Sequence, residues 1–174
     1  MSGDGPIVDA EVLLADTLAA SSHFQTLVGA ANAAEASERI FHDELPRPEG
    51  ETDADTLADF LDRLPFAVLW TNPEEGFAAT AAAGGAHHEF IDSGELVVEV
   101  WKRVADADLD DDAAAARAFK REVGLVLTDL MELAGAAGYL AITRLRAAGP
   151  WRTHPDDAWT QGQALFARLN ISWG

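Results

Sequence analysis

The sequence contains no cysteine and only two lysines, Lys102 and Lys120, among its 174 residues. Without cysteine the chain can form no disulfide bond, no thiolate nucleophile and no cysteine-ligated metal centre. Its apolar runs are short, such as residues 66–70, so no segment reaches the about 20 apolar residues of a membrane-spanning helix. The N-terminus has no basic segment followed by an apolar one, so we expect no secretory signal.

Positive charge is also scarce, because 30 Asp and Glu residues stand against 12 Lys and Arg and give a net charge of −18. Such a chain repels phosphate backbones and anionic lipids, so we expect no direct binding to nucleic acid or membrane. Hydrophobic residues make up 48% and charged residues 24% of the chain, which is typical of a folded protein.

Apolar residues at three- and four-residue spacing predict several helices. The strongest pattern gives a helix about 35–40 Å long, with Phe119, Val123, Leu127 and Leu130 on its buried side. The predicted helices cover residues 9–21, 23–28, 33–45, 57–64 and 113–137.

Alternating apolar residues predict strands, and the last of them has Leu165 to Trp173 on one face and Phe166, Arg168, Asn170 and Ser172 on the other. Turns are expected at 92–94 and 149–150, where Gly and Pro gather. The predicted strands cover residues 66–70, 77–82, 87–91, 95–104, 139–147 and 164–173.

Helices and strands are segregated along the chain rather than alternating, which favours the α+β class. We therefore expect an antiparallel or mixed β-sheet packed against a long α-helix, with additional N-terminal helices. One domain over residues 1–174 is the expected organisation, with 1–6 as a flexible tail.

One cluster of possible metal ligands is present, at His87, His88 and Glu89. Neighbouring side chains on a strand point to opposite faces, so only His87 and Glu89 could share a site, and they would need a distant ligand such as His42 or His154. We favour two solvated histidines beside a glycine-rich loop, and expect no metal and no cofactor.

Other candidate chemistry is also weak. Asp106, Asp108 and Asp110 have the spacing that opens an EF-hand loop, but its required glycine and closing glutamate are missing. The acid pairs Asp129/Glu132 and Asp59/Asp62 are interpreted as solvent-facing.

Ser21 and Ser22 beside His23 could suggest a nucleophile and a base, but neighbours in sequence rarely have the geometry of a catalytic triad. We predict no catalytic residue and hence no enzyme.

The tryptophans suggest an interface instead, because large aromatic residues anchor contacts between subunits. Trp151 follows a predicted turn, and Trp173 is the penultimate residue. Arg168 is a cation with many acidic residues available to it on a neighbouring copy, including the 106–112 run. The predicted oligomer interface therefore contains Arg168, Asn170, Trp173 and Trp151.

Five segments carry a resemblance to a known group of proteins. They are Leu64–Val68, Ser93–Val100, the helix Val123–Ala134, the block Tyr139–Pro150 and the ending Leu169–Gly174. Their order resembles that of tail-terminator and related minor tail or neck (head–tail connector) proteins of tailed bacteriophages and prophages. The resemblance covers about residues 20–174 and consists of hydrophobic pattern and turn positions, with no catalytic signature.

The resemblance implies a compact α+β subunit of a ring, typically hexameric, that caps the tail tube and joins it to the head. Its partners would be further copies of itself, the tail tube and the neck proteins, and its location would be the virion, after synthesis in the host cytoplasm. Two other classes stay open: a small soluble enzyme or ligand-binding domain, and an adaptor whose acidic surface mimics nucleic acid.

Overall fold

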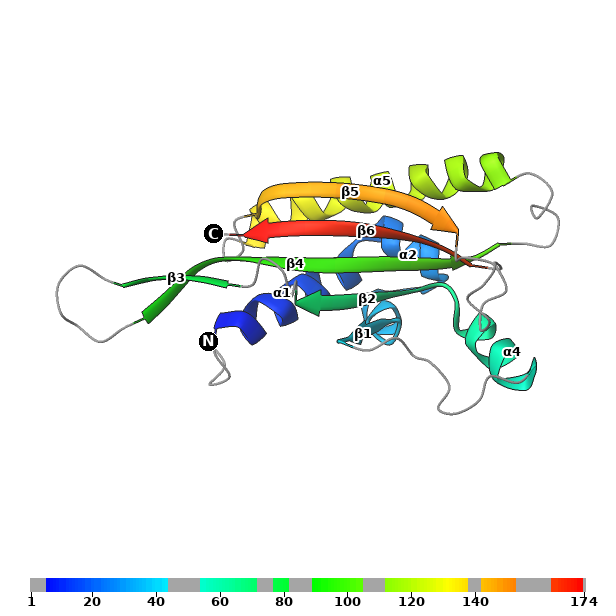
Figure 1. Ribbon diagram of the computed structural model, residues 1–174, viewed down its shortest axis with the longest axis horizontal. Helices are drawn as coiled ribbons and strands as arrows, with labels where there is room; N and C mark the ends of the chain where they lie inside the picture. The colour runs from blue at the N-terminus through cyan, green and yellow to red at the C-terminus, as the bar shows by residue number, and fades with distance from the viewer. Residues whose placement is uncertain are drawn as a thin grey trace.

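The computed structural model describes most of the helices and strands of the chain and shows a mixed α+β fold (Figure 1). The described residues are 6–43, 54–71, 77–81, 89–104, 112–137, 142–152 and 164–173. The described helices are α1 (Pro6–Ala20), α2 (Ser22–Val28), α3 (Ala33–Ser37), α4 (Ala54–Arg63) and α5 (Asp112–Ala137). The described strands are β1 (Ile40–His42), β2 (Phe66–Thr71), β3 (Phe77–Ala81), β4 (Glu89–Arg103), β5 (Ile142–Arg152) and β6 (Ala164–Trp173). The predicted α+β class is confirmed.

The strands form one mixed sheet in the order β1-β2-β4-β6-β5, so β1 and β5 are its two edges. Among the described strands, β1 and β2 run parallel and the other pairs are antiparallel. β4 is long enough to pair with β2 through one half and with β3 through the other. β3 and the first part of β4 therefore form a two-stranded arm that extends past the end of β2 (Figure 1).

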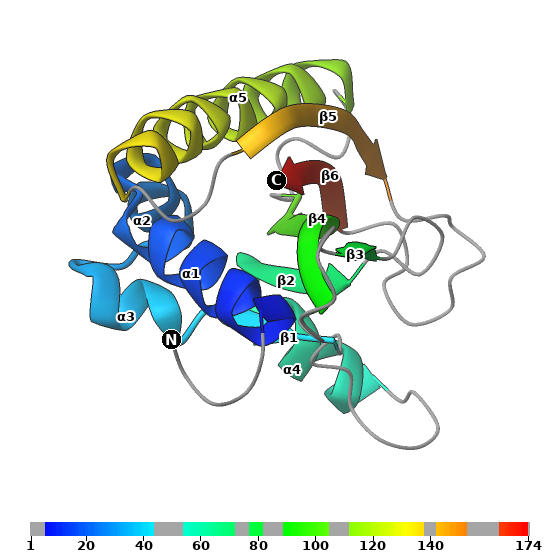
Figure 2. The same ribbon diagram turned by 90° about the vertical axis from the view of Figure 1, so that its left-hand side faces the viewer.

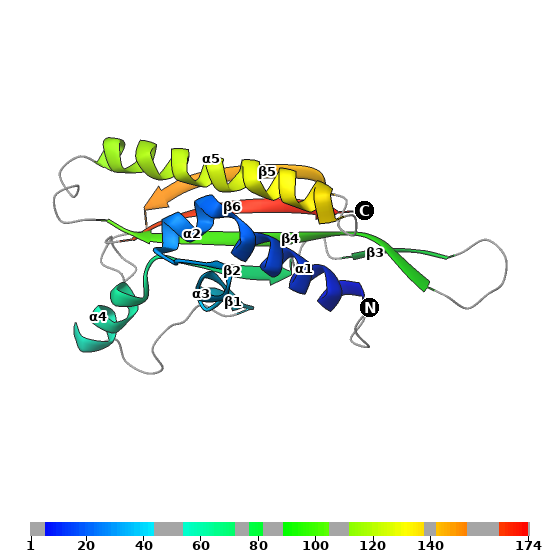
Figure 3. The same ribbon diagram turned by 180° about the vertical axis from the view of Figure 1, so that it is seen from behind.

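Helices α1, α2 and α5 cover one face of the sheet, and they cross in front of the strands when the molecule is seen from behind (Figure 3). Alternate residues of the central strands, such as Leu96 and Val98 of β4, point into this layer and are fully buried. Phe119, Val123 and Leu130 of α5 meet them, whereas Leu127, which we expected to be equally buried, is only partly covered.

A second apolar cluster lies on the opposite face, where α4 covers one end of the sheet. Phe60 of α4 packs edge-on against Phe66 of β2, with ring centroids 5.7 Å apart. Trp101 of β4 stacks on Phe66 and on Phe166 of β6, with centroid distances of 6.2 and 4.8 Å. The sheet therefore has one face buried by helices and another face buried at one end only, among the described residues.

The structure corrects the predicted helix over 33–45. α3 ends at Ser37, and Ile40–His42 form β1 alongside β2. The Asp43 amide donates to the Leu69 carbonyl at 2.8 Å, and the Ala67 amide donates to the Arg39 carbonyl at 2.9 Å. These partners come from a segment distant in sequence, which the local apolar spacing does not reveal.

Two predicted turns are also wrong, because both lie inside strands. β4 continues through residues 92–94, where its register with β3 steps from Ser93 to Ile91 and leaves Asp92 as a bulge. β5 continues through Gly149 and Pro150, with a register irregularity between Ala148 and Trp151 and a φ of 96° at Gly149. Proline is tolerated there because β5 is an edge strand.

The burial of α5 yields a prediction about stability. Leu130 has no exposed surface, so Leu130→Ala should lower the free energy of unfolding by about 2–5 kcal/mol. Met131, the next residue, is 62% exposed, so Met131→Ala should change it by less than about 0.5 kcal/mol. Urea denaturation of both variants measures the difference, and equal effects would show that α5 is not packed as described.

Candidate interaction surface

The face of the sheet opposite α5 carries polar and charged side chains over β4 and β6, beyond the end that α4 covers. The register sets Glu99 of β4 beside Arg168 of β6, and Val97 beside Asn170. Ala148 and Arg146 of β5 continue these two rows toward the edge. We call this the open face, and its polar core is the pair Glu99–Arg168.

Glu99 is a buried carboxylate with two donors. Arg168 donates from Nε to Glu99 Oε1 at 2.6 Å, and Trp101 donates from Nε1 to Oε2 at 3.2 Å. The Glu99 side chain is 6% exposed, whereas that of Arg168 is 53% exposed. Removing a carboxylate from water is costly unless such partners compensate it. Glu99 therefore holds the Arg168 guanidinium in place while leaving its other N–H groups toward solvent.

Aromatic rings border this ion pair. Trp101 and Phe166 stack at an interplanar angle of 17°, so the wall beside Arg168 is rigid and apolar. On β2, the Nε1 donor of Trp70 is buried without an acceptor among the described residues. The open face thus combines a fixed cation, the half-buried ring of Phe166 and the half-buried amide of Asn170, residue types that are common at protein interfaces.

The predicted interface residues occupy different parts of the sheet. Arg168 and Asn170 lie on the open face, with Arg168 exposed and Asn170 half-buried. Trp151 lies in register with Phe166, and Trp173 lies in register with Gly94 and Ile142; both are described by backbone position only. The sequence predicts that Arg168 contacts the acidic residues 106–112 of a neighbouring copy. Nearly all of that run lies outside the described residues, and Arg168 has an acid of its own chain, Glu99.

Ser21, Ser22 and His23 do meet an acid, Asp129 of α5. The Ser21 hydroxyl donates to Asp129 Oδ2 at 2.7 Å, and the His23 amide donates to the same atom at 3.1 Å. His23 Nδ1 lies 2.8 Å from Asp129 Oδ1. Ser21 also caps α2 by accepting from the Phe24 amide at 3.1 Å.

This cluster is a helix cap and not a catalytic triad. A triad serine donates to the histidine, whereas the Ser21 hydroxyl donates to the carboxylate and is fully buried. Asp129 sits at the positive end of α2 and ties that helix to α5. Our interpretation of Asp129 as solvent-facing is wrong, because its side chain is 14% exposed; Glu132, Asp59 and Asp62 are exposed as expected.

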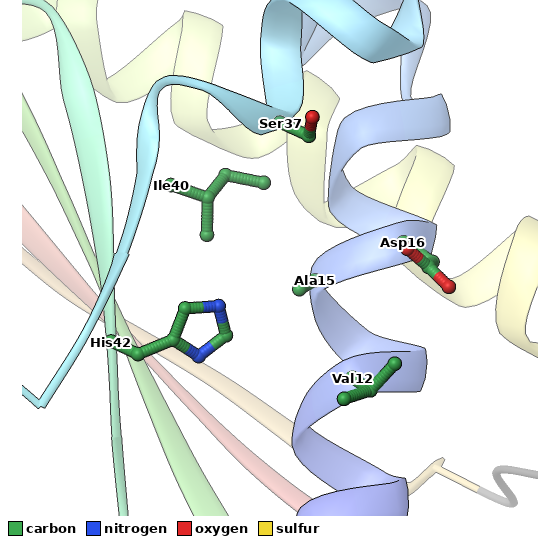
Figure 4. A pocket seen from close by; sticks show the side chains of 6 residues that line it. All are labelled: Val12, Ala15, Asp16, Ser37, Ile40 and His42. Carbon is green, nitrogen blue, oxygen red and sulfur yellow. The ribbon is translucent and has the colours of Figure 1, made fainter.

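A hollow of about 200 Å³ lies at the other edge of the sheet, between α1 and β1 (Figure 4). Ala15, Ile40 and His42 point toward one another across it, and Asp16 and Ser37 lie at its rim (Figure 4). Its volume is below the roughly 300–1,000 Å³ of sites for drug-sized ligands. The hollow therefore suits a single side chain better than a substrate.

The described ranges contain neither a metal site nor a membrane span. Within them, no three His, Asp or Glu residues come close enough to hold a metal ion. His87, His88 and His154 lie outside those ranges, as do Asp106, Asp108 and Asp110. None of the helices that the structure describes has the length and apolar character needed to span a membrane.

The Glu99–Arg168 pair leads to a second prediction. Arg168→Leu leaves a buried carboxylate with only Trp101 as partner, so it should lower the free energy of unfolding by about 1–3 kcal/mol. Adding Glu99→Gln removes the buried charge and keeps an acceptor for Trp101. The double variant should therefore recover most of the free energy of unfolding that Arg168→Leu loses. A double-mutant cycle by urea denaturation measures the coupling, and simple additivity would contradict the pairing.

The Asp129 cap predicts a dependence of stability on pH. Burial acts to raise the pKa of Asp129, but hydrogen bonds from Ser21 and His23 outweigh it and lower the pKa from 3.8 to about 2. The charged form thus stabilises the fold fully above pH 4, and this contribution is lost as pH falls through about 2. Its size is about 2 kcal/mol.

Asp129→Asn should therefore be less stable than the wild type at pH 6, and the difference should shrink between pH 4 and pH 2. Glu132→Gln, an exposed acid on the same helix, is the matched control and should show a constant small difference. Urea denaturation over this pH range provides the measurement. A wild-type advantage that does not shrink would contradict the role of the Asp129 charge.

The sequence was also compared with known proteins. No protein-family model and no curated protein matches it. The case for a function therefore rests on the open face, the two sheet edges and the resemblance of the sequence pattern.

Proposed function

We propose that this chain is a structural subunit of a tailed bacteriophage or prophage virion, a tail-terminator or neck protein that forms a ring joining the tail tube to the head. The observation that carries the proposal is Arg168, a half-exposed cation held rigidly by the buried Glu99 on the open face of the sheet. The resemblance of residues 20–174 to such proteins supplies the biological setting.

A fixed arginine supports assembly for an energetic reason. Ordering a long side chain at an interface costs about 0.5–1.5 kcal/mol, and Glu99 has already ordered Arg168 in the free subunit. Phe166, which is half-buried and stacked on the buried Trp101, adds a partly exposed apolar ring on the same face. Rigid arginine and aromatic groups are the residues on which binding energy concentrates.

The charge and shape of the subunit fit the same role. A net charge of −18 keeps free copies apart in solution, so assembly must depend on specific contacts that overcome this repulsion. The two-stranded arm of β3 and β4 extends beyond the packed sheet, where its backbone can contact a neighbouring copy (Figure 1). A ring uses one heterologous contact repeatedly, so two different surfaces of each copy must fit each other.

The proposal predicts a defined ring in solution. Light scattering on a sizing column should give a mass that is an integer multiple of 18.6 kDa, and negative-stain electron microscopy should show closed rings. Arg168→Glu combined with Glu99→Gln, which avoids two adjacent carboxylates within the fold, should weaken assembly because it replaces the exposed cation by an anion. Lys120→Glu, which also replaces an exposed cation by an anion but on α5, is the control.

A shortened chain ending after Ile171, which keeps that fully buried core residue, tests the end of β6 separately. It should assemble less well if this strand contributes to the contact. A wild-type protein that stays monomeric at all concentrations, with no effect of added tail tubes, would overturn the proposed function.

A further inference from the structure

The two edges of the sheet carry opposite charge. β5, the edge strand, contains three of the ten arginines of the chain, Arg144, Arg146 and Arg152, and neither β5 nor its neighbour β6 contains an Asp or Glu. We call this the basic edge. In a chain with 30 acids, two adjacent strands free of them are a strong local exception.

The opposite edge is acidic. Residues 6–43, which form α1, α2, α3 and β1, contain six acids and a single arginine. Asp16, Glu38 and Asp43 are exposed there. The arginine, Arg39, is half-buried and donates from Nη1 to the Arg63 carbonyl at 3.0 Å. We call α1, α3 and β1 the acidic edge, and Figure 2 shows it at the side of the sheet away from β5.

We infer that the basic edge of one copy docks against the acidic edge of the next, with Arg146 facing the hollow beside Asp16. The inference rests on the proposed ring and names the two surfaces that its repeated contact uses. Because the edges lie on opposite sides of one sheet, the contact is head-to-tail, as a ring requires.

Arg146 suits this position by exposure and chemistry. It is exposed on the edge strand, in register with Asn170, and has no partner among the described residues. An arginine has an apolar stem and a charged head. The hollow offers Val12, Ala15 and Ile40 as walls for the stem, and Asp16 points outward beside it, so the guanidinium would meet its carboxylate outside the hollow (Figure 4).

The pairing of β5 with β6 indicates which part of the edge strand can dock, namely residues 144–148. Register irregularities lie on both sides of it, between Ile142 and Arg144 and between Ala148 and Trp151. Between them, residues 144–148 form a regular stretch whose outer backbone groups belong to the sheet edge. Charge at such a contact sets the register and excludes wrong partners.

Charge reversal in two separate variants tests the contact. Arg146→Glu and Asp16→Arg should each weaken self-association, raising the dissociation constant between copies about tenfold or more. An equimolar mixture of the two variants should assemble again. In the mixture, the carboxylate introduced at position 146 of one copy faces the guanidinium introduced at position 16 of the other, while the reverse contact keeps its natural pair. Light scattering of each variant and of the mixture gives the result.

Matched controls change the same charge away from both edges: Arg117→Glu on α5 and Asp59→Arg on α4, both at exposed positions. They should assemble like the wild type. Assembly of both edge variants at wild-type strength, or no recovery in the mixture, would overturn the edge contact while leaving the ring itself standing. A wild type that never associates would overturn the ring and the edge contact together.

Cysteine cross-linking gives a readout that does not depend on ring closure. Because the chain has no cysteine, Ala148→Cys on the basic edge, on the same face of β5 as Arg146, and Val12→Cys on the acidic edge each introduce a single thiol. Mild oxidation of the mixture should yield a disulfide between copies. Pairing Ala148→Cys with Thr128→Cys on α5 is the control, and equal yields in both mixtures would contradict the docking.

Discussion

The alternation of side chains along β4 determines how the rest of the chain packs. Leu96, Val98 and Val100 point to the helical layer, and Glu99 and Trp101 point to the other side. Because β4 pairs with β2, β3 and β6, a shift of its register by one residue would bring the Glu99 carboxylate into the apolar core. Such a state is strongly unfavourable, so one strand fixes the register of three neighbours.

The sequence predicted best where the local pattern and the tertiary contacts agree. The alternation from Leu165 to Ile171 describes a strand with one buried face, and β6 spans Ala164–Trp173 as expected. The apolar spacing from Phe119 to Leu130 identifies the residues of α5 that meet the sheet. In both segments a single buried face decides the conformation, so the pattern suffices.

The failures share one cause, which is contact with residues far away in the chain. Ile40 joins β1 because its backbone pairs with β2, and Gly149 and Pro150 stay in β5 because an edge strand tolerates a bulge. Asp129 is bound by Ser21 and His23, more than one hundred residues away. For the interface, the sequence indicated Arg168 as an outward cation, but not that Glu99 of β4 would hold it.

The bulge at Gly149 and Pro150 has a consequence for the free chain. β5 is the longer of the two strands at the ends of the described sheet, and long flat edges invite other chains to add strands without limit. Pro150 has no N–H to donate, and the bulge bends the ladder. A foreign strand could therefore follow only a few residues of β5 before losing register. The chain is protected in this way from fibrous aggregation, yet keeps an edge on which a reversible contact can form.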